Sequence, residues 1–391
     1  MELSKENKDF IKDHIGDDTH KLALQGSRYP NLDFRLCLDQ IRARQKSREK
    51  LPSWHDNFDL IYPPSISVEQ ASSEFAARYK ARIIENYKKA ADLTGGFGID
   101  SIAFAEQADK LFYVEANKNL FEIFSNNSKI LELDKIIAKN STAEDFLKNT
   151  DEKFDLIYLD PDRRSQGKRL ILLEDYSPNV VELQDKLFER TNSILLKVSP
   201  MMDISRIERS LRFIKEIHVF SHKNECKELI VLLEKGYTGD VAYKAAIHQD
   251  EDTRVIEFYS ERLKIEDFST DGKFLYEADA AIMKLAFWEH IALEYSIKKI
   301  APNSHLYVSE GLRENFPGYV YKIEKKLSND KKELKKESGG KANIKCRNFP
   351  YSPEEIKKRT GIKDGGDNYL FFTRDSDSKN LVFKCKRLIL Y

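Results

Sequence analysis

The residues Asp92-Leu93-Thr94-Gly95-Gly96-Phe97-Gly98 lie at the end of a short apolar run, Lys89 to Leu93, and before a segment of helical pattern. The run predicts a buried strand, so the glycines fall where a strand turns into a helix. Doubly wound α/β folds bind ligands there, outside the carboxyl edge of the sheet, and glycine lets backbone amides approach a ligand closely. We therefore predict a ligand-binding loop; the alternative is a tight turn that binds nothing.

The apolar runs after this loop predict the other strands of the same sheet. Most are separated by segments long enough for one helix, which indicates parallel strands joined by crossover helices. Only Ser221 to Lys227 separates the last two, and that connection allows a hairpin but no helix. We expect a seven-stranded α/β sheet that ends in one antiparallel strand. The runs are Leu111 to Glu115, Lys135 to Lys139, Phe154 to Asp160, Ser193 to Ser199, Glu216 to Ser221 and Glu228 to Glu234.

Acidic residues near the loop indicate what it binds. Glu115 ends the second run 23 residues after Asp92, close to the spacing of an acid that binds cofactor ribose hydroxyls. The Asp92 carboxylate would repel a pyrophosphate but suits the ammonium and sulfonium groups of S-adenosylmethionine. A dinucleotide-binding loop would also have glycine at position 101, where this chain has Ser101. The pattern favours S-adenosylmethionine over a nicotinamide cofactor.

The segment Asp160-Pro161-Asp162-Arg163-Arg164 ends the fourth run at the same sheet edge. It resembles the D-P-P-Y or N-P-P-Y motif of methyltransferases that modify exocyclic amines of nucleic-acid bases. By that resemblance Asp160 and the Pro161 carbonyl accept hydrogen bonds from the amine. Asp162 replaces the second proline and Arg163 the stacking aromatic, and an arginine can stack on a base or bind a phosphate. The predicted catalytic residues are Asp160, Pro161, Asp162 and Arg163; the alternative is an Asp-Pro turn with solvated arginines.

The composition limits the class of protein. A chain of 391 residues, 41% of them hydrophobic, predicts two or three globular domains. Lys plus Arg and Asp plus Glu both total 65, so an argument for a nucleic-acid partner must be local. The four cysteines form no C-x-x-C pair, and His218 and His222 lie on strand-like sequence, so we predict no metal and no disulfide. A charged N-terminus and the lack of a long apolar stretch predict a cytoplasmic location without a membrane.

The two ends of the chain differ from the sheet region. The N-terminal part predicts helices at Lys8 to His14, Asn31 to Lys50 and Val68 to Asn86. After Gly239 we expect a small α+β region with strands at Val255 to Tyr259 and Gly272 to Glu277 and a helix at Ala278 to Tyr295. Ten basic against four acidic residues between Tyr321 and Arg347 make the most basic stretch.

Three segments together resemble a bacterial family of class I S-adenosylmethionine-dependent methyltransferases with a C-terminal THUMP-like domain. They are Asp92 to Asp100, Asp160 to Arg164 and Lys341 to Thr373. The resemblance implies a Rossmann-like methyltransferase domain, a ferredoxin-like domain and a THUMP-like domain, and it implies an RNA substrate such as tRNA or rRNA. The expected bounds are residues 1–62 for an N-terminal helical segment, 63–238 for the methyltransferase domain, 239–318 for the ferredoxin-like domain and 319–391 for the THUMP-like domain.

The segment Ser67 to Glu74 corresponds to the one that covers the cofactor in cap-guanosine and related RNA methyltransferases; a helix capped by Ser67, with Gln70 completing a capping box, is the alternative. Where the family usually has an acid that reads the adenine, this chain has Thr142, so its hydroxyl, backbone groups or Asp145 take that role. The predicted cofactor-binding residues are Asp92, Thr94, Gly95, Gly96, Phe97, Gly98, Glu115, Ala116, Thr142, Ala143, Gln70 and Ser72. The predicted RNA-binding residues are Arg164, Lys341, Arg347, Lys357, Lys358 and Arg359.

Three functions are compatible with these patterns. The first is methylation of RNA at a base nitrogen. The second is methylation of a protein or a small molecule, and the third is RNA binding by a non-catalytic protein that retains the fold. A steep dependence of RNA binding on salt separates the first from the second, and measurable S-adenosylmethionine affinity separates the first from the third.

Overall fold

The computed structural model describes residues 3–163, 172–259 and 263–388. The chain forms two compact units: residues 1–218 with 228–241, and residues 219–227 with 242–391. We call them the first and second unit and describe each by itself.

The first unit contributes seven strands to a sheet of nine, in which β10 (Ala242–Gln249) and β11 (Asp252–Phe258) follow β8, so the expected total of seven strands is wrong. Its strands run β3-β2-β1-β4-β7-β9-β8 across the sheet, and β3, β2, β1, β4 and β7 pair in parallel. β9 pairs with β7 in antiparallel fashion and lies next to β8, so the predicted hairpin is confirmed, but the sheet continues beyond β8 and does not end there as expected. The strands are β1 (Lys89–Asp92), β2 (Lys110–Glu115), β3 (Ile136–Asn140), β4 (Leu156–Leu159), β7 (Ser193–Val198), β8 (Ile214–His222) and β9 (Glu225–Glu234).

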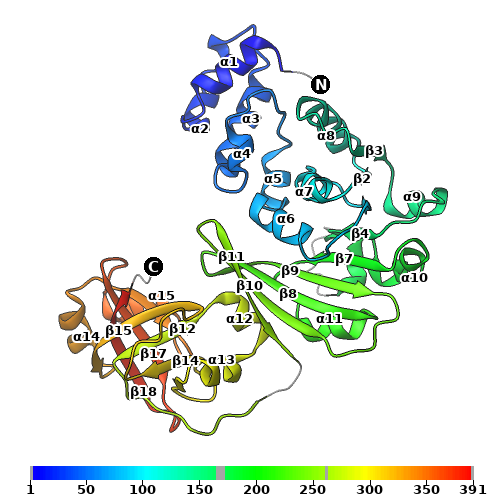
Figure 1. Cartoon of the computed structure of the whole chain (residues 1–391). Coiled ribbons are helices and arrows are strands. Elements are labelled where there is room, and N and C mark those ends of the chain that lie inside the picture. The colour runs from blue at the N-terminus through cyan, green and yellow to red at the C-terminus, as the bar shows by residue number, and fades with distance from the viewer. Residues whose placement is uncertain (1–2, 164–171, 260–262, 389–391) are drawn as a thin grey trace. The chain divides into compact units, whose positions relative to one another are not determined.

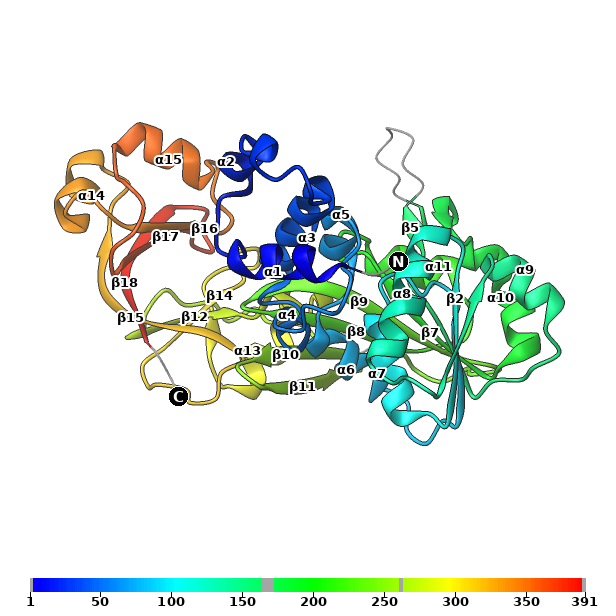
Figure 2. The same ribbon diagram turned by 90° about the horizontal axis from the view of Figure 1, so that it is seen from above.

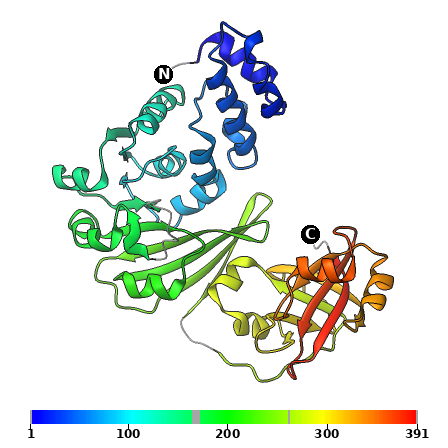
Figure 3. The same ribbon diagram turned by 180° about the vertical axis from the view of Figure 1, so that it is seen from behind.

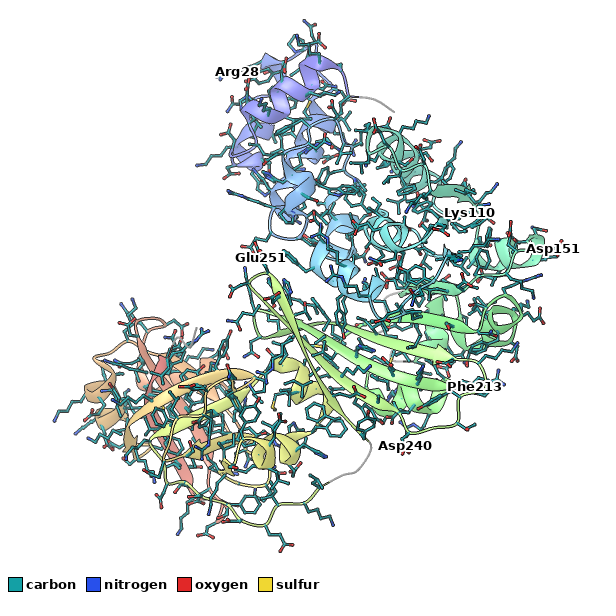
Figure 4. The ribbon with its side chains drawn as sticks, viewed as in Figure 1. Arg28, Lys110, Asp151, Phe213, Asp240 and Glu251 are labelled. Carbon is teal, nitrogen blue, oxygen red and sulfur yellow. The ribbon has the colours of Figure 1, made fainter. Side chains whose placement is uncertain are left out.

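Helices cover both faces of this sheet. Figures 1 and 2 show α6, α7 and α8 on one side and α9, α10 and α11 on the other, the arrangement of a doubly wound fold. Lys110, Asp151 and Phe213 stand at or just before the amino ends of β2, β4 and β8 and lie along one side of the unit in Figure 4. The helices are α6 (Glu74–Ala81), α7 (Ile99–Gln107), α8 (Lys118–Ile130), α9 (Ala143–Asn149), α10 (Val180–Arg190) and α11 (Ile204–Ser210).

The N-terminal helices pack on the sheet and helices of the first unit through buried polar and aromatic contacts. The Asn127 side chain of α8 bonds both the amide and the carbonyl of Ile61, at 2.9 and 2.8 Å. The rings of Trp54 and Tyr62 lie 5.1 and 5.4 Å from that of Phe97. The elements are α1 (Lys5–Asp13), α2 (Thr19–Ala23), the 3₁₀ turn η1 (Gly26–Arg28), α3 (Phe34–Ser47), α4 (Pro52–His55) and α5 (Ser65–Gln70).

Two predicted helices are each broken into two. Val68 to Asn86 is divided between α5 and α6 because the backbone of Ala71 is extended and Ser73 caps a new helix by accepting from the Ala76 amide. The capping box that we considered at Ser67 is wrong, since α5 begins two residues earlier and Pro64 is its N-cap. Ala278 to Tyr295 is divided at Ala286, which adopts a left-handed conformation.

The second unit contains a second sheet with the strand order β13-β14-β12-β15-β18-β17-β16. Alternate residues of β17 enter different cores: Phe371 packs with Tyr321 and Phe383, whereas Leu370 and Phe372 pack with residues of α14 and α15. Figure 3 shows α14 and α15, in orange, beside the red last strands.

The elements of the second unit are as follows. The strands are β10 (Ala242–Gln249), β11 (Asp252–Phe258), β12 (Phe274–Ala278), β13 (Lys298–Lys299), β14 (Leu306–Ser309), β15 (Gly318–Leu327), β16 (Asn343–Cys346), β17 (Asn368–Arg374) and β18 (Asn380–Leu388). The helices are α12 (Ala280–Leu285), α13 (Trp288–Glu294), α14 (Lys331–Ser338) and α15 (Pro353–Thr360).

Candidate functional site

A cavity of about 430 Å³ lies in the first unit at the carboxyl ends of β1, β2, β3 and β4. Its volume is in the range of ligand pockets. Eight predicted cofactor-binding residues line it, together with two of the predicted catalytic residues. The lining consists of Ser67, Gln70, Ala71, Leu93, Thr94, Gly96, Phe97, Glu115, Ala116, Asn117, Leu120, Thr142, Ala143, Glu144, Asp160, Asp162, Ser177 and Pro178.

Glu115 organises one side of the cavity. Its Oε2 accepts a hydrogen bond from the Gly96 amide at 2.7 Å, and its Oε1 accepts one from the Asn117 amide at 2.6 Å. Burial raises the pKa of this carboxyl, and the two backbone hydrogen bonds oppose the rise. A carboxylate has about four acceptor positions, so both oxygens keep capacity for ligand hydroxyls.

Asp92 does not line the cavity but anchors the loop from below. Its Oδ2 accepts from the Ser101 hydroxyl at 2.5 Å, and its Oδ1 accepts from the Thr94 amide at 3.0 Å. Burial raises the pKa of Asp92 to about 7, although these hydrogen bonds lower it. Ser101, which replaces the third glycine of a dinucleotide loop, therefore has a structural role in this chain.

Positions 95 and 98 need glycine because aromatic rings leave no room there for a side chain. Close approach of a ligand is not the reason. The rings of Tyr113 and Phe124 stack at 3.7 Å beneath the loop. A Cβ on Gly95 would lie 2.2 Å from the Tyr113 ring, and one on Gly98 would lie 2.3 Å from Phe124. Gly98 also has a φ of +90°, which only glycine adopts easily. Of the three glycines, Gly96 alone lines the cavity.

The segment that precedes β1 contributes two predicted residues in different ways. Gln70 lines the cavity at the end of α5. Ser72 is buried, donates to Asp100 Oδ2 at 2.8 Å and accepts from Lys80 at 2.6 Å, so it holds the segment in place. Thr142 also lines the cavity; it is the N-cap of α9, and its side chain accepts from the Asp145 amide at 3.1 Å.

The predicted catalytic segment forms an extended structure instead of the Asp-Pro turn that we considered. Asp162 and Arg163 form β5 (Asp162–Arg163), which pairs with β6 (Tyr176–Ser177). The Asp160 amide donates to Thr94 Oγ1 at 2.6 Å and thereby joins the end of β4 to the glycine loop. Pro161 is buried and Asp162 lines the cavity. Arg164 lies outside the described residues.

A network of buried charges lies next to the cavity. The fully buried Lys80 ammonium contacts Asp100 Oδ1 at 2.9 Å and Glu228 Oε2 at 2.6 Å. Tyr158 donates to the second oxygen of Asp100 at 2.8 Å. Lys197 donates to Asp160 Oδ2 at 2.6 Å. Sequence reasoning did not find Lys80, Asp100 or Glu228, because their pairing joins segments that are far apart in the chain.

Two of the residues predicted to bind RNA form ion pairs within the protein instead. Arg347 contacts Glu277 Oε1 at 2.6 Å, and Lys357 contacts Asp364 at 2.7 Å. Lys341 and Lys358 are exposed, and the exposed Arg359 stacks 3.5 Å over the Tyr351 ring. The N-terminal Arg44 is fully buried and donates to the carbonyls of His55, Asn57 and Leu60. Arg44 therefore has a structural role.

The cavity lining also includes Ser177 and Pro178, which sequence reasoning missed because the segment before them carries no motif. Within residues 3–163, 172–259 and 263–388, no three His, Cys, Asp or Glu side chains are grouped as a metal ion requires. Across the same ranges no helix is long and apolar enough to cross a membrane.

Comparisons with known proteins identify the two C-terminal domains. Residues 274–317 match the model of a ferredoxin-like domain, and residues 318–387 match that of a THUMP domain-like family. Both domains that the resemblance implied are confirmed.

The whole chain is similar to known methyltransferases. A solved protein of Porphyromonas gingivalis W83 that is assigned to the methyltransferases is 28% identical, with a TM-score of 0.84 and 100% of each chain covered. An uncharacterized S-adenosylmethionine-dependent methyltransferase of Mycobacterium tuberculosis, from strains CDC 1551 and H37Rv, is 20% identical over 312 residues, which are 79% of this chain and 83% of the relative. Fold and matches define the protein as an S-adenosylmethionine-dependent methyltransferase of the class I fold with ferredoxin-like and THUMP-like domains.

The aromatic stack beneath the loop predicts the effect of a small substitution. Gly95→Ala forces the new methyl group against Tyr113, whose hydroxyl is held by the Gly96 carbonyl at 2.7 Å. We expect a loss of about 1 to 3 kcal/mol in the free energy of unfolding, measured by urea titration. Gly16→Ala is the control, because nothing lies within 4 Å of its Cβ. Equal urea midpoints for the two variants would contradict this role of Gly95.

Proposed function

We propose that this methyltransferase transfers a methyl group to a base nitrogen of RNA, with tRNA or rRNA as the substrate. The observation that carries the proposal is the position of Asp160, which lines the cavity beside the glycine loop. In the proposal the cofactor occupies the side formed by Gly96 and Glu115, and the target amine enters beside Asp160.

The chemistry of the cavity lining suits S-adenosylmethionine. The Glu115 carboxylate would accept the ribose hydroxyls, and backbone groups near Thr142 and Ala143 would contact the adenine, since the Thr142 hydroxyl already caps α9. Thr94, Gly96, Phe97, Ala116 and Gln70 would complete the contacts. Asp92, Gly95, Gly98 and Ser72 support these residues from behind the cavity.

Asp160 would orient the acceptor. By the resemblance to the D-P-P-Y motif, its carboxylate and the Pro161 carbonyl accept the N–H groups of an exocyclic amine and aim the nitrogen lone pair. When bound, S-adenosylmethionine would supply an activated methyl group: the amine nitrogen would take the methyl carbon, the electron pair of the C–S bond would stay on sulfur, and a proton would pass from nitrogen to solvent. Because the donor is already activated, the contribution of these residues is orientation and charge stabilisation.

The C-terminal domain supports an RNA substrate. THUMP domains bind RNA, and the match over residues 318–387 is to a THUMP domain-like family. Lys341, Lys358 and Arg359 are exposed there, and the Arg359–Tyr351 stack offers a cation beside an aromatic ring. Cations with aromatic faces are the groups that bind single-stranded nucleic acid.

The role of Asp160 is tested by its removal. Asp160→Ala should reduce methyl transfer at least about 100-fold, because the amine loses its acceptor, while the affinity for S-adenosylmethionine changes little. The assay follows tritiated methyl transfer to total RNA from cells that lack the gene, and mass spectrometry of nucleosides identifies the product. Asp185→Ala, at an exposed site paired with Arg212, is the control. Wild-type transfer by the Asp160 variant would overturn this assignment.

The acidic lining favours a second candidate. Glu115, Glu144, Asp160 and Asp162 all line the cavity, and such a surface suits a small cationic amine or a protein side chain better than a phosphate backbone.

Salt dependence distinguishes the two candidates. For an RNA substrate, the logarithm of the RNA binding constant should fall linearly with the logarithm of salt concentration, and Lys358→Ala should reduce the slope by about 1. Lys118→Ala, on the exposed part of α8, should leave the slope unchanged. Weak RNA binding with no such slope would favour the small-amine or protein candidate.

A further inference from the structure

Among the side chains that the structure describes, Lys197 is the basic residue that binds Asp160. It lies on β7, and its Nζ donates to Asp160 Oδ2 at 2.6 Å. The side chains are 11% and 31% exposed, so solvent screens the pair only in part. Lys197 does not line the cavity, so it influences the reaction through its contact with Asp160.

The contacts of Asp160 leave one oxygen for a substrate. The backbone amide is held by Thr94 Oγ1, and Oδ2 is held by Lys197. Within the part of the chain that the structure describes, no hydrogen-bond partner reaches Oδ1. The carboxylate is thus fixed at two points and keeps one acceptor atom beside the cavity.

Charged groups on every neighbouring element face this pair. Lys80 of α6 and Asp100 of α7 interact with Asp160, and Asp92 of β1 lies near it. Asp162 of β5, Glu228 of β9 and Asp100 interact with Lys197, and the Tyr158 hydroxyl of β4 interacts with Asp160. Lys50, which donates to the carbonyls of Val68 and Glu69, also interacts with Lys197. Lys80 is already bound by Asp100 and Glu228, so among the described side chains Lys197 is the cation in direct contact with Asp160.

The contact between Asp160 and Lys197 favours the charged form of both side chains. Burial raises the pKa of the Asp160 carboxyl, and the Lys197 ammonium opposes that rise. Burial alone would lower the pKa of Lys197, but the carboxylates of Asp160, Glu228 and Asp100 outweigh it and raise the pKa. Lys197 therefore stays charged, and without it Asp160 would bind a proton more readily.

We propose that Lys197 is a positioning residue for methyl transfer, which holds Oδ2 of Asp160 and keeps the carboxylate ionised so that Oδ1 accepts the N–H of the substrate amine. The inference rests on the proposed role of Asp160. A protonated Asp160 would lose the negative charge that stabilises the positive charge developing on the amine nitrogen. The acid limb of the pH–rate profile then reports the ionisation of Asp160, and its position depends on Lys197.

Removal of the cation tests the proposal. Lys197→Met should move the acid limb of the transfer rate upward by about one to three pH units, because the ammonium no longer favours the carboxylate. Activity should recover as the pH rises, while the affinity for S-adenosylmethionine is kept. Lys197→Arg retains the charge and should restore the wild-type profile. Lys89→Met removes a lysine paired with Glu152 at the opposite end of the sheet and should leave the profile unchanged.

Two variants separate action through Asp160 from loss of structure. In the Asp160→Asn background the titrating group and its acid limb are absent, so adding Lys197→Met should leave the pH profile unchanged. An unmoved acid limb in Lys197→Met, or an equal loss of rate at every pH that Lys197→Arg does not rescue, would overturn the proposal.

A measurement independent of activity distinguishes failure of this inference from failure of the proposed function. In protein labelled with carbon-13 at aspartate carboxyls, the signal that disappears in Asp160→Asn reports the titration of Asp160. Its midpoint should be higher in Lys197→Met than in the wild type. Equal midpoints would refute the action of Lys197 on Asp160 even if RNA is methylated. A raised midpoint without methylation of any RNA would support that action and refute the RNA substrate.

Discussion

The cavity depends on the ion pairs and the hydrogen bond that the buried ammonium of Lys80 makes with its neighbours. An uncompensated buried charge costs several kcal/mol, so Lys80 must keep its partners on three different elements. Those partners are Ser72 in the segment before α6, Asp100 at the start of α7, and Glu228 on β9. The same contacts therefore hold together the segment Ser67 to Glu74, helix α7 behind the glycine loop, and strand β9.

The strand pattern of the first unit followed from the sequence because it depends on local hydrophobic runs and the lengths between them. The glycine loop and Glu115 were also predictable, since their spacing is a local property of a strand-to-helix turn. The structural reason for Gly95 and Gly98 could not be predicted from the sequence. Gly95 and Gly98 are explained by the Tyr113–Phe124 stack, which lies on β2 and α8 and is visible only in the folded chain.

Ion pairs account for most of what the sequence could not predict. Lys80 and Glu228 are 148 residues apart, and nothing in a lysine flanked by alanine and tyrosine indicates a fully buried charge. The same limit affects basic residues that look available for RNA. Arg44 binds backbone carbonyls and Arg347 binds the buried Glu277, so a count of cations overestimates the surface that can contact phosphates.

The cavity joins two kinds of acidic group with different tasks. Glu115 is held by backbone amides and, in the proposed function, accepts hydroxyl groups of the cofactor, whereas Asp160 is held by a lysine and is proposed to accept an amine through its other oxygen. This division is consistent with a methyltransferase in which cofactor and acceptor meet at the carboxyl edge of one sheet. In β5, Asp162 and Arg163 stand where the D-P-P-Y motif has its second proline and its aromatic residue. The proposed acceptor side therefore differs from that motif in sequence.

The cavity lined by Thr94, Gly96 and Glu115 is expected to bind the cofactor. Calorimetric titration of S-adenosylhomocysteine into the wild type and Glu115→Gln tests it most directly, with Glu144→Gln as a control acid from the same cavity lining. Binding should weaken about 10-fold or more in Glu115→Gln, because a charged acceptor for the ribose is lost, and much less in the control. Equal affinities of the wild type and Glu115→Gln would contradict it.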